Sequence, residues 1–399
     1  MFVSLVVCTL FPRFALTVAV GDREELLRAP AALAPEPGRR ERIGDVSLAA
    51  EAFGVRAGMP LGEALARCPT LALVPPDPAG VADAWERVLV RLESIGAAVE
   101  PERPGLACFA ADGLVRLHGG ALDHVLAAAR RAIGRPVRIG VGPSRFCALA
   151  AATRARPRRP QVVLGDARAA RDYLAPLPVA LLRGRAETAA LPEALGRLGI
   201  ATLGELAALP AEAVADRFGD AGLLAHALAR GQDGPLRARE APERIEEELE
   251  LPEALSGVQL DRALGLLVDR LLARRERRGR TLRAAVLAAT LVEGGTWREQ
   301  VPFREPLADA TRMRLALAPR LALLPAPAER LRLAAVRFGP PAGGQRALLD
   351  EAAAARRARR RERVRQVRAA AGPDAALRVL AVDPDSRVPE RRAILTPFE

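Results

Sequence analysis

The chain has 399 residues, too many for one ordinary core, and this length predicts two to four domains. Half of the residues are hydrophobic and 3% are aromatic, which favours aliphatic cores over aromatic-rich sandwiches or disordered tails. The formal net charge is +12 and the basic residues are all arginine, so a polyanion such as nucleic acid is the expected partner, unless coding bias alone explains the arginines.

The first part of the chain predicts a mixed α/β domain. The apolar start is broken by Pro12 and Arg13 and lacks a small-residue cleavage pattern, so we expect a buried strand from Phe2 to Thr9, not a signal peptide or membrane span. A turn is predicted at Asp112 and Gly113. Hydrophobic periodicity predicts helices at 46–53, 61–68, 81–95 and 122–133, and strands at 71–74, 105–111 and 137–141.

The rest of the chain predicts a helical module and a second α+β domain. Short helices punctuated by Gly and Pro run from Leu177 to Asp233, and an acidic, Pro-containing link follows from Glu240 to Pro252. The order helix, strand, strand, helix, strand is then predicted at 260–278, 282–293, 296–303, 311–323 and 331–338. A linker at 340–344, an Arg-dense helix at 351–371 and an irregular tail complete the chain.

The cysteines and histidines indicate neither a metal site nor a disulfide framework. The cysteines contain no CxxC pair, and the three histidines form no HExxH or comparable pattern. We therefore expect reduced, structural cysteines in a cytoplasmic protein. The residues concerned are Cys8, Cys68, Cys108, Cys147, His118, His124 and His226.

Several motifs, in order and spacing, carry a resemblance to a known family. They are Phe53 to Pro60 with Ala64, Cys68-Pro69 and Leu73 to Asp77; Gly113 to Gly119; Ile139 to Pro157; Leu198 to Leu209; and Arg217 to Gly219. Over residues 1–339 the chain resembles the Y-family translesion DNA polymerases, the UmuC/DinB superfamily.

That resemblance implies an α+β, multidomain, right-hand fold. It implies a palm and fingers in 1–165, a helical thumb with a helix-hairpin-helix-like segment in 166–238, and a little-finger-like DNA-binding domain in 239–339. Residues 340–399 would then hold a linker, a clamp-binding peptide and a basic tail.

The carboxylates that the family uses for catalysis are missing from this sequence. Nucleotidyl transfer needs two divalent ions, and hard Mg²⁺ prefers carboxylate oxygens. The family supplies an Asp near the end of its first strand and an Asp-Glu pair on its central strand. Alignment by neighbouring residues places Leu10, Gly105 and Leu106 there. We therefore expect no catalytic residue, no metal ligand and no cofactor.

Other acids are poorly placed to substitute. Asp112 lies six residues beyond Leu106, which is about 20 Å along an extended strand. Glu100 and Glu102 precede the strand, and Asp22 lies beyond the break at Pro12. A displaced metal site is the alternative that these acids leave open.

The expected contacts to an incoming nucleotide are also eroded. The resemblance places the family's triphosphate-binding Tyr and Arg at Leu48 and Glu51. Leucine donates no hydrogen bond, and a glutamate repels phosphate. Arg156 is the one basic remnant, at the position of a phosphate-binding Lys. Apolar replacements at such positions are otherwise expected simply to fill the core.

A Y-family scaffold without its acids resembles the ImuB-type proteins of bacterial mutagenesis cassettes. The resemblance implies a non-catalytic DNA-repair adaptor in SOS mutagenesis and translesion synthesis. Its implied partners are damaged or primer-template DNA, the sliding clamp, an accessory protein and an error-prone replicative-type polymerase. Two alternatives stay open: an active translesion polymerase that uses Mg²⁺ at a displaced site, and a generic basic nucleic-acid-binding protein.

A clamp-binding peptide is predicted after the last folded domain. It needs a Gln and two large apolar residues on a flexible tether, and Gln345, Leu348 and Leu349 follow the linker Gly343-Gly344. Arg346 departs from the usual apolar second residue. A simple helix start is the alternative.

Two arginine clusters are candidates for phosphate contact. The first is assigned to the DNA-binding little finger and comprises Arg270, Arg274, Arg275, Arg277, Arg278, Arg280 and Arg283. The second lies in the tail, where a partner protein, DNA or plain solvent are all open, and comprises Arg356, Arg357, Arg359, Arg360, Arg361, Arg363, Arg365 and Arg368.

Overall fold

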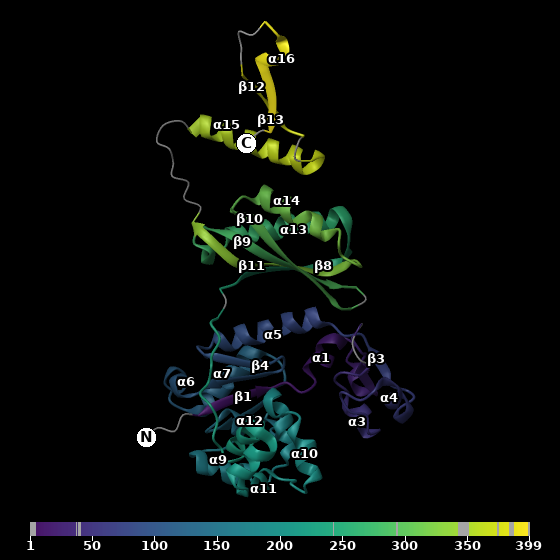
Figure 1. Cartoon of the computed structure of the whole chain (residues 1–399), viewed down its shortest axis with the longest axis vertical. Helices are drawn as coiled ribbons and strands as arrows, with labels where there is room; N and C mark the ends of the chain where they lie inside the picture. The colour runs from purple at the N-terminus through teal and green to yellow at the C-terminus, as the bar shows by residue number, and fades with distance from the viewer. Residues whose placement is uncertain are drawn as a thin grey trace. The chain divides into compact units, whose positions relative to one another are not determined.

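The computed structural model describes residues 5–36, 38, 41–241, 243–292, 294–341, 351–372, 375–382 and 387–397 (Figure 1). The chain divides into two units, one formed by Met1–Arg278 with Leu282–Gly339 and the other by Gly279–Thr281 with Pro340–Glu399. Among the helices of the described residues, none has the length and hydropathy that crossing a membrane requires.

The centre of the first unit is a five-stranded sheet with the strand order β4-β5-β1-β6-β7. The strands are β4 (Val99–Arg103), β5 (Leu106–Ala110), β1 (Val6–Leu10), β6 (Arg138–Gly142) and β7 (Gln161–Val162), antiparallel except for β6 with β7. Helices α5 (Pro78–Glu93) and α7 (Leu122–Ile133) cover one face. On this face the rings of Phe14 and Trp85 pack edge to face, with their centroids 5.5 Å apart.

Helix α8 (Arg145–Arg154) packs against the other face of this sheet. The approach is close because β6 carries glycine where a side chain would obstruct it: a Cβ at Gly140 would lie 2.1 Å from the carbonyl oxygen of Ala148. Residues Phe146 to Ala152 are all buried. This helix therefore lacks a polar face, which explains why hydrophobic periodicity did not predict it.

Two smaller modules flank the sheet within the same unit. One joins the parallel strands β2 (Ala31–Leu33) and β3 (Ala72–Val74) to short helices: α1 (Phe14–Val20), α2 (Glu25–Arg28), α3 (Leu48–Ala52) and α4 (Leu61–Arg67). The other is all helical and contains α9 (Ala167–Leu174), α10 (Leu191–Arg197), α11 (Leu203–Ala208) and α12 (Ala211–Ala229). Helix α11 begins with a capping box, in which Thr202 and Glu205 satisfy each other's backbone amides.

A second sheet has the order β10-β9-β11-β8 and carries two helices on one face (Figure 1). Its strands are β8 (Ile245–Leu255), β9 (Arg280–Leu291), β10 (Thr296–Leu307) and β11 (Ala328–Pro341). The helices are α13 (Gly257–Ala273) and α14 (Ala310–Leu321). The described part of the second unit contains α15 (Glu351–Ala371) and the hairpin β12 (Leu377–Ala381) with β13 (Ala393–Pro397), joined through α16 (Pro389–Arg392).

The α+β fold class is confirmed, and most predicted elements lie within a few residues of the observed ones. Three local predictions were wrong. The expected turn at Asp112 and Gly113 begins helix α6 (Asp112–Leu117), the acidic link after Glu240 contains strand β8, and the irregular tail contains a hairpin. Strand β4 was missed because Pro101 and flanking charges hide its alternation. Strand β8 was misread because its glutamates, which suggested solvated chain, are paired with arginines.

Candidate functional site

The positions expected to hold catalytic carboxylates lie in an apolar cluster. Leu10 on β1 is directly opposite Leu106 on β5, and beside them Cys8 is opposite Cys108. Leu106 is 1% exposed, and Leu10 packs against the same cluster, which α8 closes with Ala148, Leu149 and Ala152. A hydrogen bond with Cys8 and burial raise the pKa of Cys108 well above its ordinary value, so this thiol is neutral.

Gly105 has no room for a side chain. Its φ of +88° lies in the region that glycine alone adopts freely. A Cβ added there would lie 2.8 Å from the Cβ of Phe14 and 3.1 Å from the carbonyl oxygen of Phe11. The backbone is held in place because the amide of Phe11 donates to the carbonyl of Gly105 at 2.8 Å. An aspartate at this position would require the loop before β5 to rearrange.

The residues at this position therefore do not fit a pair of Mg²⁺ ions. Leucine and glycine side chains offer no oxygen ligand, and hard divalent cations require several. Among the residues that the structure describes, no group of three or more His, Cys, Asp or Glu side chains is arranged to hold a metal ion.

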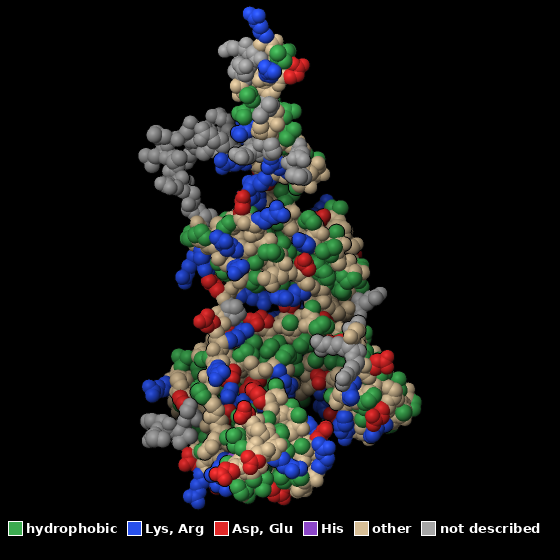
Figure 2. Space-filling model, viewed as in Figure 1, with side chains coloured by type: hydrophobic (Ala, Val, Ile, Leu, Met, Phe, Trp, Pro, Cys, Tyr) green, Lys and Arg blue, Asp and Glu red, His purple; other side chains and the backbone are tan. Residues whose placement is uncertain are grey.

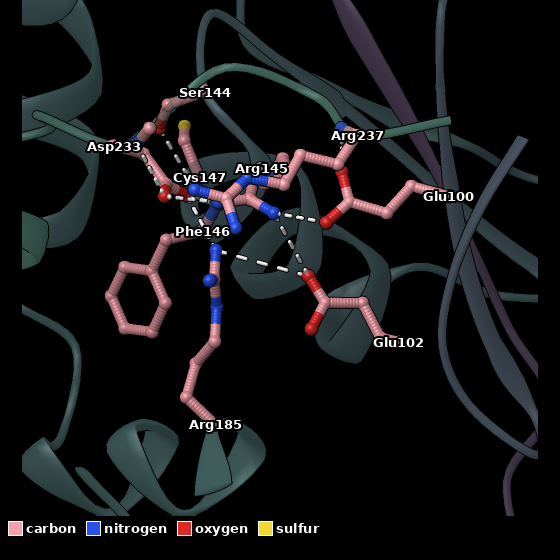
Figure 3. Close-up of polar contacts among 10 residues, drawn as sticks. Glu100, Glu102, Ser144, Arg145, Phe146, Cys147, Arg185, Asp233 and Arg237 are labelled. Atoms are coloured by element: carbon pink, nitrogen blue, oxygen red, sulfur yellow. Dashed lines mark hydrogen bonds and ion pairs between the residues drawn. The ribbon is translucent and has the colours of Figure 1, made fainter. Parts of the chain in front are cut away.

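The nearest alternative acids, Glu100 and Glu102 on β4, are engaged by arginines (Figure 3). Glu100 pairs with Arg145, the first residue of α8, and accepts from the backbone amide of Arg237 at 2.6 Å. Glu102 lies 3.8 Å from Arg145 and 3.9 Å from Arg185. Guanidinium groups thus neutralise these carboxylates, which point into a polar hub.

Asp233 completes this hub from the segment after α12. Its carboxylate accepts from Arg145 at 3.0 Å, from Arg185 at 2.6 Å and from the backbone amide of Phe146 at 2.9 Å. The side chain of Asp233 is 2% exposed. Burial alone would lower the pKa of Arg145, but Asp233 and Glu100 raise it above its ordinary value. The hub joins the five-stranded sheet, the helical module and the segment that leads to the second sheet.

The remaining acids considered from the sequence have other surroundings. Asp112 accepts from the backbone amide of Leu5 at 3.2 Å, and Asp22 is exposed in the turn after α1. Neither lies in the cluster of Leu10 and Leu106.

Of the expected nucleotide-contact positions, Glu51 is engaged by an arginine of the protein itself. Glu51 on α3 pairs with Arg13 at 2.8 Å, and Arg13 also donates from Nε to the carbonyl of Val46 at 2.7 Å. The carboxylate of Asp45 accepts from the backbone amides of Ala15 and Leu16 at 3.2 and 3.4 Å. Carboxylates of the protein thus already bind the guanidinium of Arg13 and the two backbone amides, the groups that an anionic ligand would need here. Leu48 is 67% exposed, so core filling does not explain this replacement.

Comparison with known proteins decides the family. The model of the impB/mucB/samB family matches residues 10–153. DNA polymerase IV from Ralstonia nicotianae is 30% identical over 277 residues, which cover 66% of this chain and 74% of that protein. The chain belongs to the Y-family DNA polymerases. DNA polymerase IV from Caulobacter vibrioides is also 30% identical, over 200 residues that cover 49% of each protein, so this match spans about half of that relative.

Among solved structures, this Y-family chain is similar to DinB from Sulfolobus solfataricus. The TM-score is 0.49 at 17% sequence identity, over 84% of this chain and 99% of that chain.

The predicted DNA-contacting arginines of this Y-family chain lie on and after α13. Arg270 and Arg283 are exposed, whereas Arg274 pairs with Glu247 on β8. Arg277 donates to the carbonyl of Leu272 at 3.0 Å, and Arg278 adopts a positive φ of 49°. Arg275 is exposed and Arg280 is partly exposed. Arg156, the predicted nucleotide-binding remnant, is exposed in a turn after α8. The DNA-binding role of the arginines on and after α13 and the nucleotide-binding role of Arg156 stay predictions.

The predicted clamp-binding residues Gln345, Leu348 and Leu349 lie outside the described residues. Sequence reasoning missed the hub of Arg145, Arg185 and Asp233. These three are far apart in the chain, and isolated Arg and Asp residues are common in so charged a sequence, so no local pattern marks them.

Proposed function

We propose that the protein is a non-catalytic, ImuB-like Y-family adaptor. It binds primer-template DNA and the sliding clamp and supports error-prone translesion synthesis by another polymerase during SOS mutagenesis. An accessory protein and an error-prone replicative-type polymerase complete its partners. The observation that carries the proposal is Gly105, whose positive φ and crowded Cβ position leave no space for a metal-binding side chain.

The surroundings of Gly105 support the same conclusion. Leu106 is buried among cysteine, alanine and leucine side chains, and Glu100 and Glu102 are engaged by Arg145. Two Mg²⁺ ions carry four positive charges, so a site without free carboxylates cannot hold them against hydration. Catalysis would have to come from a partner polymerase.

The proposed division of labour follows the domains predicted from the sequence. Residues 1–165 form palm and fingers, 166–238 the thumb, 239–339 the DNA-binding little finger, and 340–399 the clamp-binding and tail region. A net charge of +12 carried by arginine supports binding of a polyanion. The exposed Arg270 and Arg283 are the first contacts to test.

A primer-extension assay tests the loss of catalysis. The purified protein is given a labelled primer-template, dNTPs and Mg²⁺ or Mn²⁺, with the Ralstonia nicotianae relative as positive control. We expect the protein to shift the electrophoretic mobility of the labelled primer-template without extending the primer. Extension that disappears in Glu100→Gln or Glu102→Gln would contradict the proposal, because those are the nearest acids.

A clamp pull-down tests the adaptor role separately. Leu348→Ala with Leu349→Ala should abolish capture by the sliding clamp, and Gln345→Ala should weaken it. The matched control is Leu377→Ala with Leu395→Ala, which removes two exposed leucines from the tail hairpin. Capture that is equal in all these variants would eliminate the proposed peptide.

A second candidate function is template-directed DNA synthesis by this chain itself. The observation that favours it is that the curated relatives are named DNA polymerase IV. It requires a displaced metal site, and the same extension assay decides between the two. A third candidate, a generic basic nucleic-acid-binding protein, predicts DNA binding with neither extension nor clamp capture.

A further inference from the structure

The second sheet has a charged face opposite its two helices. Alternate residues of β9 and β11, among them Leu287 and Leu333, pack beneath the helices, so their neighbours project from the other face. The register of the strands then determines which side chains share that face. They are Arg298 and Gln300 on β10; Ala284, Val286 and Ala288 on β9; Arg330 and Arg332 on β11; and Glu246, Glu248 and Glu250 on β8.

This face is covered by helix α5 of the first sheet. Ala284, Val286 and Ala288 are at most 3% exposed although they lie outside the core beneath the helices. At the start of α5, a Cβ added to Gly80 would lie 2.7 Å from the Oγ1 of Thr296 on β10. Acidic and basic side chains gather where helix α5 meets the second sheet (Figure 2).

Asp83 is the centre of this contact. It is 3% exposed on α5, pairs with Arg332 and lies 3.6 Å from Arg298. Arg332 is 6% exposed, and its Nε lies 3.5 Å from Glu246. Arg87, one turn along α5, lies 3.9 Å from Glu248. The two parts are therefore joined by reciprocal ion pairs, with the most deeply buried one at Asp83.

The burial makes the contact depend on Asp83. Burial lowers the pKa of Arg332 to about 10. The surroundings therefore disfavour the charged form of this guanidinium, although the group still carries its charge at neutral pH. Glu246 offsets little of this, because burial raises its own pKa and it is shared with Arg244. Removing one partner of a buried pair leaves the other charge uncompensated, which favours separation of the surfaces and entry of water.

We propose that Asp83 closes an intramolecular lock, in which a carboxylate of α5 occupies the arginines of the second sheet and nucleic acid phosphate displaces it. This inference rests on the proposed DNA-binding function. The arginines on the face, Arg298, Arg330 and Arg332, suit phosphate oxygens in charge and in hydrogen-bonding geometry. In the closed state their charges are balanced by Asp83, Glu248 and Glu250.

The connecting segment is anchored separately, which lets the lock open without releasing the chain. Arg239 donates to both Glu86 and Glu93 on α5 at 2.6 to 3.0 Å, and its backbone amide donates to Val99. Movement of the second sheet would therefore leave the anchor at Arg239 in place.

The first test measures the lock without DNA. Fluorophores are placed at Leu117→Cys on α6 and Val258→Cys on α13, which are 66% and 69% exposed, while the four native cysteines are buried. In Asp83→Asn the distances between the two fluorophores should be longer and more broadly distributed. Glu212→Gln, an exposed site on α12, makes the same change in net charge and should not. An unchanged distance in Asp83→Asn would overturn the proposal.

The second test adds a labelled primer-template duplex. If the closed state holds most of the molecules, freeing the arginines raises the apparent affinity in proportion, so Asp83→Asn should bind about tenfold more tightly than Glu212→Gln. In the wild type, saturating duplex should produce the same distance shift as Asp83→Asn; binding without that shift would overturn the lock even if the variant failed to fold. Absence of DNA binding by every protein would instead contradict the proposed function, while the distances alone would still decide the lock.

Discussion

Replacing Gly105 by alanine tests the crowding on which the loss of the metal site depends. A φ of +88° costs a residue with a Cβ about 1–2 kcal/mol. The added methyl group would also lie 2.8 Å from Phe14 Cβ and 3.1 Å from Phe11 O, and such overpacking costs about 1–3 kcal/mol. We therefore expect Gly105→Ala to lower the free energy of unfolding by about 2–5 kcal/mol.

Urea unfolding followed by tryptophan fluorescence measures this loss. Trp85 packs against Phe11 and Phe14 and so reports on the neighbourhood of Gly105. Gly62→Ala is the matched control, because Gly62 lies in α4 with open space at its Cβ position. It should change stability by no more than about 1 kcal/mol, towards greater stability. Equal unfolding midpoints for the two variants would show that the position of Gly105 tolerates a side chain.

Three further predictions concern the hub, a buried thiol and the basic surface. Asp233→Ala leaves Arg145 and Arg185 without their shared carboxylate and should destabilise the protein by about 3–5 kcal/mol, against little change for the exposed Asp220→Ala, as measured by urea unfolding. Burial raises the pKa of Cys147 from 9.0 to about 12, so the unfolded chain loses this proton first as the pH rises. The contribution of the buried neutral thiol to the free energy of unfolding should be complete below pH 9. Between pH 9 and 12 the free energy of unfolding should fall by up to about 1.4 kcal/mol per pH unit, a slope that Cys147→Ala should reduce. Arg270→Gln with Arg283→Gln should weaken duplex binding and lower the slope of log affinity against log salt concentration by about 1 per arginine. The control Arg28→Gln on α2 should leave this slope unchanged. An equal slope in both variants would show that Arg270 and Arg283 do not contact the duplex.

The elements that the sequence predicted well are those with one buried face. Helix α7 has the predicted bounds because Val125, Leu126, Ala129 and Ile133 repeat at helical spacing beneath a polar face. Elements buried on all sides or rich in charge gave no such signal. Helix α8 is buried all around, and β8 carries glutamates that only arginines on neighbouring parts of the fold explain.

The candidate site was predictable only in part. The motifs around β1 and β5 predicted Leu10, Gly105 and Leu106 at the family's carboxylate positions, and the register of β1 and β5 places Leu10 opposite Leu106. The positive φ of Gly105 and the engagement of Glu100 by Arg145 depend on tertiary packing, which no local pattern contains. The contact between Asp83 and Arg332 likewise joins residues almost 250 positions apart and follows only from how the second sheet meets α5.

A crystal of the protein with primer-template DNA, an incoming nucleotide and Mn²⁺, measured for anomalous scattering, tests the loss of the metal site. We expect bound duplex and no manganese peak beside Leu10, Gly105 and Leu106. Two manganese peaks there, bridging protein carboxylates and the nucleotide phosphates, would contradict this expectation.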